Sequence, residues 1–332
     1  MYQTKFHSED ISKKTFLVTG GAGFIGSNIV EYLLKYGAGK VRVLDNLSEG
    51  LRENVDLFTD NPNYEFVEGS ITDYATCLNN CKRIDYVLHQ AALGSVPRSI
   101  KNPLATNEAN VTGFLNMLTA AKDSGVKRFV YASSSSVYGD SAELPKKEDK
   151  IGKPLSPYAV SKLVNEFYAD VFARTYNMQV IGLRYFNIFG PRQKPDGPYA
   201  AAIPLFMDAL LNNKSPFING DGEQTRDFTF VENAVQANIR GLFTKVEGAT
   251  GQVFNVAVAE RISINLLFNT LKKLTDSEIN PTYREEREGD IRNSLADISK
   301  AQKYLEYEPT TKVEKGLEIT LNWFKTRKPQ KV

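Results

Sequence analysis

Short apolar runs and longer amphipathic segments alternate along the first 190 residues of the 332-residue chain. The runs are rich in β-branched and aromatic residues, as strands are, and the segments between them repeat apolar residues at helical spacing. The predicted strands are Thr15–Thr19, Val41–Asp45, Tyr64–Glu68, Tyr86–His89, Phe129–Ala132 and Gln179–Arg184. The predicted helices begin near Phe24, Asp73, Pro103, and Ser156 or Pro157. This alternation predicts an α/β fold built on a parallel sheet with helical crossovers.

The character of the chain changes after Gly190, where glycine, proline and polar residues interrupt it and the elements become shorter. We therefore expect residues 1–190 to form the main domain and residues 191–332 to form mainly a smaller, mixed α/β lobe. Segments within about 226–258 are expected to return to the main domain. The best candidates for these returning segments are Val231–Phe243 and Gln252–Val256.

The net charge of +2, with 24% charged and 42% hydrophobic residues, gives no electrostatic case for a nucleic-acid or membrane partner. No apolar run approaches the roughly 20 residues that span a bilayer. The segment before Thr15 is polar and has no signal-peptide pattern. Two cysteines and two histidines are too few for a disulfide framework, a histidine triad or a zinc site. The sequence therefore predicts a cytoplasmic protein without a metal.

A glycine-rich segment, Gly21-x-Gly23-x-x-Gly26, joins the first predicted strand to the first predicted helix, and Gly20 offers a second frame. Glycine suits this place because a tight turn, a nearby pyrophosphate and close helix–strand packing all exclude a side chain. The N-terminus of the following helix attracts phosphate. Asp45 ends the next strand, where a carboxylate accepts hydrogen bonds from ribose hydroxyls and repels a 2′-phosphate. The pattern predicts a Rossmann-type doubly wound sheet that binds NAD; an ordinary βαβ turn is the alternative.

Tyr158 and Lys162 lie one helical turn apart on one face of a predicted helix. An isolated tyrosine, with a pKa of ~10, is a poor base. An adjacent ammonium group and a positive nicotinamide ring would stabilise the phenolate and lower that pKa. Ser134 lies in a serine run at the end of the fifth predicted strand and is predicted to hydrogen-bond the reacting hydroxyl. A polar turn is the alternative interpretation of this run, and it suits Ser133 and Ser136 better.

With these motifs in this order, the chain resembles the extended short-chain dehydrogenase/reductase superfamily. Further segments resemble its UDP-hexose 4-epimerase branch and, within that branch, the UDP-N-acetylglucosamine 4-epimerases, and the resemblance covers almost the whole chain. Val137–Gly139, after the serine run, belongs to the superfamily pattern. The segments that resemble the branch are Arg184–Asn187, Gly220–Gly222, Arg226–Phe228 and Arg287–Asp290, and those that resemble the UDP-N-acetylglucosamine 4-epimerases are Gly94–Ile100 and Tyr199–Ala201.

The resemblance implies an isomerase that interconverts UDP-N-acetylglucosamine and UDP-N-acetylgalactosamine for surface polysaccharides such as O-antigen or capsule. Tightly bound NAD takes a hydride from C4 of the sugar while Tyr158 removes the O4 proton through or beside Ser134. The 4-keto sugar then turns and receives the hydride on its other face. The implied catalytic residues are Tyr158, Lys162 and Ser134. The implied cofactor contacts are Gly20, Gly23, Phe24, Ile25, Gly26, Asp45, Asn46, Ile71, Asp73, Ala91, Ala92, Asn110, Tyr158, Lys162 and Tyr185, although Asp73 could equally cap a helix.

A second set of residues is implied to bind the UDP-sugar. Arg226 and Arg287 suit its phosphates, because guanidinium groups match phosphate oxygens. Ser294 stands where relatives restricted to non-acetylated sugars carry a tyrosine, so it leaves room for an N-acetyl group. Ala201 similarly replaces a bulkier amide. The full implied set is Gly94, Ser95, Ser134, Ser135, Asn187, Gln193, Ala201, Arg226, Arg287 and Ser294.

Dehydratases of the superfamily carry Thr-Asp-Glu where Ser134–Ser136 stands here, so a dehydratase is disfavoured. Arg192 could bind a carboxylate at C6, which leaves a UDP-N-acetyl-hexuronic acid 4-epimerase or a decarboxylase open. A UDP-glucose/galactose 4-epimerase and a non-catalytic NAD-binding regulator are further alternatives. The resemblance also implies a homodimer in which helices Pro103–Ser124 and Pro157–Tyr176 form a four-helix bundle, although both could instead face the core.

Overall fold

Seven parallel strands form one sheet in the computed structural model, which describes residues 1–195, 201–286 and 292–326. The strand order is β11-β6-β5-β4-β1-β2-β3, and every neighbouring pair is parallel. All six predicted strands are present, and the α/β fold class is confirmed. The strands are β1 Thr15–Thr19, β2 Lys40–Asp45, β3 Tyr64–Glu68, β4 Tyr86–His89, β5 Arg128–Ser134, β6 Val180–Tyr185 and β11 Gln252–Val256.

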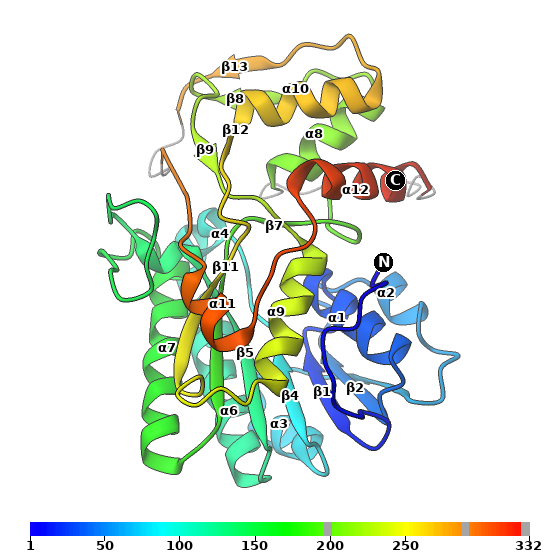
Figure 1. Ribbon diagram of the computed structural model, residues 1–332, viewed down its shortest axis with the longest axis vertical. Helices are drawn as coiled ribbons and strands as arrows, with labels where there is room; N and C mark the ends of the chain where they lie inside the picture. Colours follow the sequence, from blue (N-terminus) through cyan, green and yellow to red (C-terminus); the bar gives the residue numbers. More distant parts are fainter. Residues whose placement is uncertain (196–200, 287–291, 327–332) are drawn as a thin grey trace.

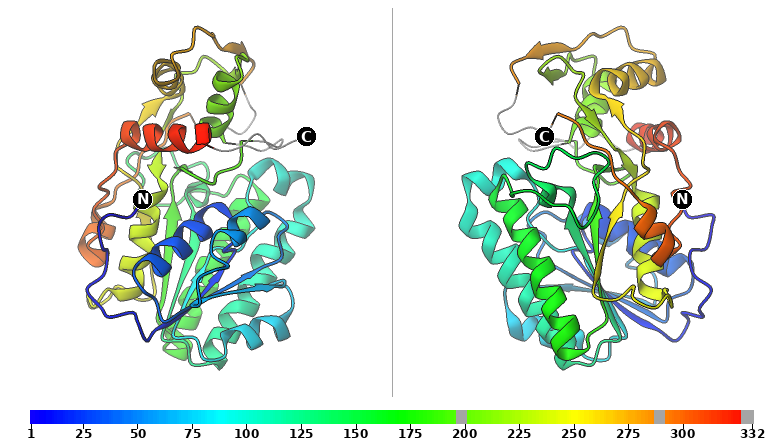
Figure 2. Two further views of the ribbon diagram at one scale, coloured as in Figure 1. Left: turned by 90° about the vertical axis from the view of Figure 1, so that its right-hand side faces the viewer. Right: turned by 60° about the vertical axis from the view of Figure 1, so that its left-hand side comes forward.

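Helices cover both faces of this sheet (Figure 1, Figure 2). On one face, α1 (Phe24–Lys35) and α9 (Val231–Phe243) pack side by side and bury apolar residues of β1, β2 and β11. On the other face lie α3 (Tyr74–Cys81), α6 (Gly113–Asp123) and α7 (Pro157–Tyr176). The helices α2 (Arg52–Asp56) and α4 (Val96–Lys101) are short. Because the inner strands β1, β4 and β6 are almost fully buried, they are short apolar runs rather than alternating ones, which is typical of parallel sheets, whereas the edge strand β3 is only partly buried.

The helix expected over Pro103–Ser124 is one helical run with an irregular centre. It consists of α5 (Pro103–Asn107), a π-helical segment η1 (Glu108–Thr112) and α6. Asn110 lies within η1 and is buried; its side chain accepts a hydrogen bond from the Leu93 amide at 2.7 Å and donates to the Leu93 carbonyl at 3.0 Å. The π segment thus fixes the chain that follows β4, and a local insertion of this kind leaves no mark on apolar periodicity.

The smaller lobe has its own apolar core, formed chiefly by α8 (Ala202–Leu211), α10 (Ile264–Thr275) and α12 (Val313–Thr326). It has three two-stranded pairs: β7 (Ile188–Phe189) with β10 (Thr229–Phe230), β8 (Phe217–Asn219) with β13 (Thr282–Arg284), and β9 (Thr225–Arg226) with β12 (Ile262–Ser263). The chain returns to the main sheet through α9 and β11, and α11 (Ser299–Leu305) packs beside them.

The segment before Thr15, which the sequence shows only as polar, contributes buried aromatic residues. Tyr2 and Phe6 are almost completely enclosed. The Tyr2 hydroxyl donates to Asn28 Oδ1 at 2.7 Å, and Asn28 Nδ2 donates to the Pro191 carbonyl at 3.1 Å. The N-terminal arm therefore supports the turn at Pro191, where the chain leaves the sheet. Within the described ranges, the helices are too short or too polar to cross a membrane.

Candidate functional site

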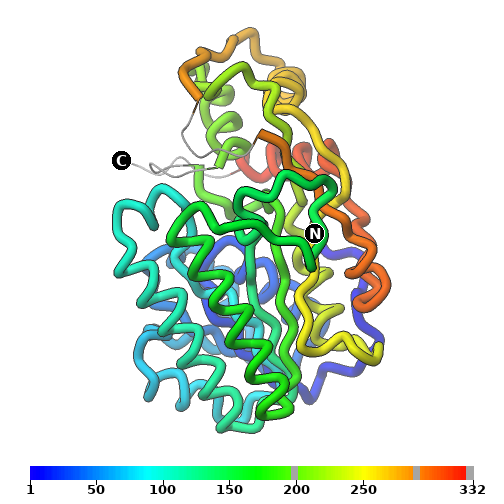
Figure 3. The backbone as a smooth tube through the Cα atoms, turned by 90° about the vertical axis from the view of Figure 1, so that its left-hand side faces the viewer, coloured from blue at the N-terminus to red at the C-terminus, as the bar shows by residue number. Residues whose placement is uncertain are grey.

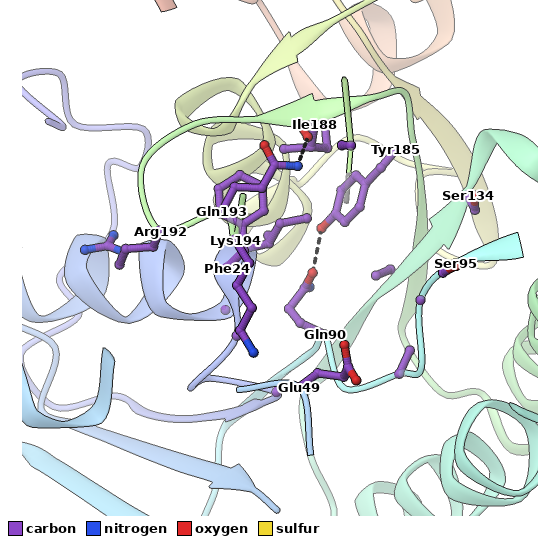
Figure 4. Close-up of a pocket in the computed structure, with 18 of the residues that line it drawn as sticks. Phe24, Glu49, Gln90, Ser95, Ser134, Tyr185, Ile188, Arg192, Gln193 and Lys194 are labelled. Atoms are coloured by element: carbon purple, nitrogen blue, oxygen red, sulfur yellow. Dashed lines mark hydrogen bonds between the residues drawn. The ribbon is translucent and has the colours of Figure 1, made fainter. Parts of the chain in front are cut away.

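Two adjoining cavities open at the carboxyl ends of the strands, and Figure 4 shows residues that line this region. The larger cavity, of about 510 Å³, extends from the glycine turn to Tyr158 and Ala201. The smaller cavity, of about 310 Å³, contains Asp45 and Ile71. Gly20, Gly23, Glu49, Gln90 and Ala92 line both cavities. The two cavities are therefore halves of one elongated cleft, located where ligands of open α/β sheets bind.

The glycine turn fits a pyrophosphate group for steric reasons. Gly20 has a φ of +69°, and a Cβ there would lie 2.6 Å from the Ala91 amide nitrogen. A Cβ on Gly26 would collide with the Gly20 carbonyl. The N-cap of helix α1 is Gly23, which has no side chain to bond the first turn. The first backbone N–H groups of the helix, from Phe24 on, are therefore available to an anion.

Asp45 occupies the position expected of a ribose-binding carboxylate. One of its oxygens accepts from the Leu47 amide at 2.8 Å and the other from the Ala22 amide at 3.0 Å. These two bonds fix the carboxylate at the wall of the smaller cavity and leave lone pairs for hydroxyl groups. Burial raises the pKa of Asp45 from its ordinary value, and the two amide bonds oppose this change. The arrangement fits the adenosine half of NAD.

The other predicted cofactor residues divide into two groups. Those that line the cleft are Gly20, Gly23, Phe24, Ile25, Gly26, Asn46, Ile71, Ala91, Ala92, Tyr158, Lys162 and Tyr185. Two others do not line it. Asp73 is exposed and caps α3, accepting from the Thr76 amide at 3.0 Å, so the structure shows the helix-cap alternative for this residue. Asn110 is held under the cleft by its bonds to Leu93 and also donates to Ser161 Oγ on α7 at 3.1 Å, so it supports the cleft from two segments without lining it.

Tyr158, Lys162 and Ser134 meet at the larger cavity. Lys162 Nζ lies 6.0 Å from the centre of the Tyr158 ring and donates to the Ala132 carbonyl at 2.9 Å. The Ser134 side chain lies close enough to Tyr158 to lower its pKa, and its hydroxyl accepts from the Ser136 amide at 3.2 Å. A hydroxyl placed beside Ser134 would therefore have a path for its proton to the phenol of Tyr158.

The electrostatics of this group differ from the expectation drawn from the sequence. Desolvation by the protein raises the pKa of Tyr158, and the opposing contribution comes from the Ser134 side chain rather than from Lys162. Burial lowers the pKa of Lys162 to about 8. The protein by itself therefore does not supply a tyrosinate near neutral pH. The phenolate needs further positive charge in this cavity, which an oxidised nicotinamide ring would bring.

The predicted substrate residues are distributed over two cavities. Gly94, Ser95, Ser134, Asn187, Gln193 and Ala201 line the larger one. Ser95, Asn187 and Ala201 also line a third cavity, of about 330 Å³, which extends into the smaller lobe and which Arg226 lines too. We call it the lobe cavity. Ser135 and Ser294 are half-buried and do not line these cavities, and Arg287 lies outside the described residues.

Arg192 lines the larger cavity, but its side chain does not face the sugar-side residues. Its guanidinium group forms an ion pair with Glu31 on α1, with 2.6 Å between Nη2 and Oε2, and its side chain is 9% exposed. Figure 4 shows it pointing away from Ser95 and Ser134. The idea that Arg192 binds a C6 carboxylate is therefore not supported by its position.

Sequence reasoning missed an aromatic surface in the lobe cavity. Phe217 on β8 is 57% exposed, and the Arg284 guanidinium carbon lies 5.1 Å from the centre of its ring. Arg284 Nε donates to Asn219 Oδ1 at 2.5 Å. A planar base can stack on such a surface. The available signal was Phe217 itself, an aromatic residue three positions before the glycine-rich segment at Gly220.

Charged residues of the larger cavity were also missed. Glu49 and Arg98 face each other there, with 2.6 Å between Arg98 Nη1 and Glu49 Oε1, and Lys194 lines the same space. Figure 4 shows the Lys194 side chain extending toward Glu49. None of the three belongs to a motif that spacing identifies. Among the described residues, no group of three or more His, Cys, Asp or Glu side chains is placed to hold a metal ion.

Residues 16–257 match the family described as NAD dependent epimerase/dehydratase. The chain belongs to this family. A putative UDP-glucose 4-epimerase of Methanocaldococcus jannaschii is 38% identical over 93% of this chain and 98% of its own length. A UDP-glucuronate 4-epimerase of Thermodesulfobacterium geofontis is 33% identical over 93% of this chain and 96% of its own length.

A solved structure is similar over the same extent. The UDP-N-acetylglucosamine 4-epimerase of Methanobrevibacter ruminantium, in complex with UDP-N-acetylmuramic acid, has a TM-score of 0.89 and 41% identity, with 94% of this chain and 98% of that chain covered. The predicted family, NAD as cofactor and the class of enzyme, a UDP-sugar 4-epimerase, are confirmed. The residues around the cleft fit this cofactor: a turn that excludes side chains and a carboxylate at the ribose position.

Replacing Gly26 with alanine tests how this epimerase holds NAD. The added methyl group would displace the Gly20 carbonyl, and overpacking of this kind costs about 1–3 kcal/mol. We expect NAD to bind roughly tenfold more weakly or worse, measured as NAD retained after purification and by calorimetric titration. Gly241→Ala is the matched control, because a Cβ there would have its nearest neighbours at 3.5 Å. Equal NAD retention by both variants would contradict the steric role of Gly26.

Proposed function

We propose that this cytoplasmic enzyme interconverts UDP-N-acetylglucosamine and UDP-N-acetylgalactosamine by inversion at C4 through a 4-keto sugar, with NAD held between turnovers. Its product would supply surface polysaccharide synthesis. The observation that carries the proposal is the meeting of Ser134, Tyr158 and Lys162 in the same cavity as the glycine turn. The similarity to a UDP-N-acetylglucosamine 4-epimerase supports the choice of sugar.

In this proposal Tyr158 takes the proton from O4 and later returns it, with the Ser134 hydroxyl as the bridge. Lys162 lies under the phenol and stabilises its negative charge. Bound NAD supplies oxidation and then reduction at C4. Because the same cofactor serves both steps, the redox balance closes within one turnover and no external electron donor is needed.

Inversion also requires a firm hold on UDP and a loose hold on the sugar. The lobe cavity offers the firm part: Phe217 for the base and Arg226 for the diphosphate. The sugar side of the larger cavity is lined by small side chains, including Gly94, Ser95 and Ala201. A sugar there can present either face without crossing a bulky residue. This division supports an epimerase over a non-catalytic regulator, which would need no such free space.

The substituents at C2 and C6 define the substrate. We propose an N-acetyl group at C2 because Ala201, which lines the larger cavity, is small, and because the family resemblance aligns the small Ser294 with a residue beside C2. We propose a hydroxymethyl group at C6 because Arg192 is engaged by Glu31 and is not available to a carboxylate. The similar UDP-glucose and UDP-glucuronate 4-epimerases make those two sugar nucleotides the principal competitors.

We also propose a homodimer. The run from α4 to α6 lies beside α7 on one side of the molecule (Figure 3). This face leaves large apolar side chains exposed, among them Leu104 at 82%, Ile100 at 62% and Phe167 at 60%. An exposed apolar face of this kind is typical of an interface. A second copy would cover it by pairing the same helices in a four-helix bundle.

An assay with separate UDP-sugars tests the activity. NMR of the anomeric protons should show UDP-N-acetylglucosamine converted to its C4 epimer at a rate above those for UDP-glucose and UDP-N-acetylglucosaminuronate. Tyr158→Phe should lower turnover by about 10²–10⁴-fold while NAD stays bound, because it removes only the proton acceptor. Inversion of the uronate alone, or an active Tyr158→Phe enzyme, would defeat the proposal.

The N-acetyl site can be tested through Ser294. Ser294→Tyr should abolish turnover of UDP-N-acetylglucosamine and spare UDP-glucose, because the ring would fill the space beside C2. Ser294→Ala is the control and should retain both activities. The ratio of kcat/KM for the two substrates is the measurement. An unchanged ratio in Ser294→Tyr would show that this residue does not border C2.

The dimer can be tested by Phe167→Asp, which places a charge in the proposed bundle. We expect a change from dimer to monomer, measured by light scattering after size-exclusion chromatography. Leu57→Asp is a control of equal exposure, 60%, on the far side of the sheet near α2. A wild-type protein with the mass of one chain would refute the proposed dimer.

A further inference from the structure

A buried ion pair lies next to the proposed catalytic residues. Arg184 on β6 contacts Glu166 on α7 through two bonds, Nε to Oε1 at 2.9 Å and Nη2 to Oε2 at 2.8 Å. The two side chains are 3% and 8% exposed. Taking both charges out of water is costly, so such a pair is weak evidence for stability and invites a functional explanation.

The pair is part of a network that reaches the reacting end of β5. Three consecutive residues of this strand each engage one residue of α7. The Ala132 carbonyl accepts from Lys162, the Ser133 hydroxyl donates to Glu166 Oε1 at 2.5 Å, and Ser134 lies close enough to Tyr158 to lower its pKa. On α7 the three partners stand at successive intervals of four residues, so they share one face of the helix.

Arg184 extends the network away from the cavity. Its Nη1 donates to the Glu148 carbonyl at 3.0 Å, and its guanidinium carbon lies 4.9 Å from the centre of the Tyr138 ring. Tyr138 in turn donates to Asn255 Oδ1 on β11 at 2.7 Å. Glu166 is therefore fixed directly from β5 and β6, and Arg184, which holds it from β6, is itself held by Tyr138 and the Glu148 carbonyl.

We propose that Glu166 is a positioning residue of the epimerase: held by Arg184 and Ser133, it fixes α7 against the end of β5 and keeps the neighbouring Lys162 in its charged form. This inference rests on the proposed function, because that function gives the charge of Lys162 its purpose. Glu166 lies one helical turn beyond Lys162, on the side away from Tyr158, and does not line the cavity.

The charges around Lys162 support this role. Burial lowers the pKa of Lys162 to about 8, and the Glu166 carboxylate is the group that opposes this change. Tyr158 on α7 is neutral without added positive charge. His89 on β4 also faces Lys162; burial lowers its pKa to about 3, so it carries no charge near neutral pH. Arg184 on β6 is neutralised by Glu166.

Removal of the Glu166 charge would therefore lower the pKa of Lys162 for two reasons. The attraction of the carboxylate would disappear, and the Arg184 cation would be left uncompensated nearby. Both changes disfavour the ammonium form, so Lys162 would lose its proton at a lower pH. Because the phenolate needs that ammonium group, the alkaline limb of the pH profile of kcat should move to lower pH.

The test is Glu166→Gln in the NAD-loaded enzyme, since the amide has the same shape and its oxygen can still accept from Ser133 and Arg184 Nε, while the bond from Arg184 Nη2 is lost with the charge. We expect the alkaline limb of kcat to move down by on the order of one pH unit. The Cε signal of Lys162, observed by NMR in [13C]lysine-labelled enzyme and assigned with Lys162→Met, should titrate lower by the same amount. A titration that stays where the wild type has it overturns the proposal.

Two controls separate charge from contact. Asp170→Asn neutralises the next carboxylate along α7, which pairs with Arg174 at the surface, and should leave both titrations unchanged. Ser133→Ala removes the hydrogen bond but keeps the charge, so kcat should fall several-fold while the titration of Lys162 stays in place. A shift of the Lys162 titration in Asp170→Asn as large as that in Glu166→Gln would overturn a specific role for Glu166.

The role of Glu166 can still be tested in two further cases. If Glu166→Gln does not fold, the double variant Glu166→Gln/Arg184→Met removes both buried charges and should still lower the Lys162 titration; an unchanged titration refutes the inference. If no UDP-sugar is epimerised by the wild type, the proposed function fails. The NMR titration then still decides whether Glu166 holds the Lys162 charge.

Discussion

Parallel pairing of all seven strands is the constraint on which this enzyme depends. Because every strand of the main sheet runs the same way, the residues that follow β1, β2, β4 and β5 meet at one edge. The turn at Gly20, the Asp45 carboxylate and the Ser134 hydroxyl are far apart in the sequence, yet they line one cleft. An antiparallel arrangement would send alternate strand ends to opposite edges and divide this set of groups.

The cleft combines two opposite demands. The groups that we propose for nucleotide binding are constrained by their neighbours: glycine backbone without space for a methyl group, a carboxylate bonded to two amides, and an aromatic ring beside a guanidinium group. The sugar side is lined by small residues that leave volume free. In the proposed function, affinity for the nucleotide and freedom for the sugar come from different residues, so side chains beside the sugar, such as Gly94 and Ala201, could change without disturbing the cofactor turn.

Apolar patterning and short motifs were sufficient to predict the sheet, because buried parallel strands are uninterrupted apolar runs between turn residues. They also located Tyr158 and Lys162, since helical spacing places both on one face. Three features could not be predicted from the sequence in this way. The Arg192 side chain is directed by Glu31, and the Tyr158 pKa is set by desolvation, so both depend on contacts made only in three dimensions. Phe217 lies on a three-residue strand, too short for a periodic pattern.

The path of the chain has a consequence for its synthesis. Strand β6 forms its outer ladder with β11, and α9 covers the sheet nearby, but both follow the smaller lobe in the sequence. While the chain emerges from the ribosome, the edge of β6 and the apolar surface under α9 stay uncovered until residue 256 has been made. Unpaired strand edges of this kind promote association between chains. A nascent or truncated product ending near residue 190 would therefore be an aggregation-prone species that depends on chaperones, rather than an autonomous nucleotide-binding module.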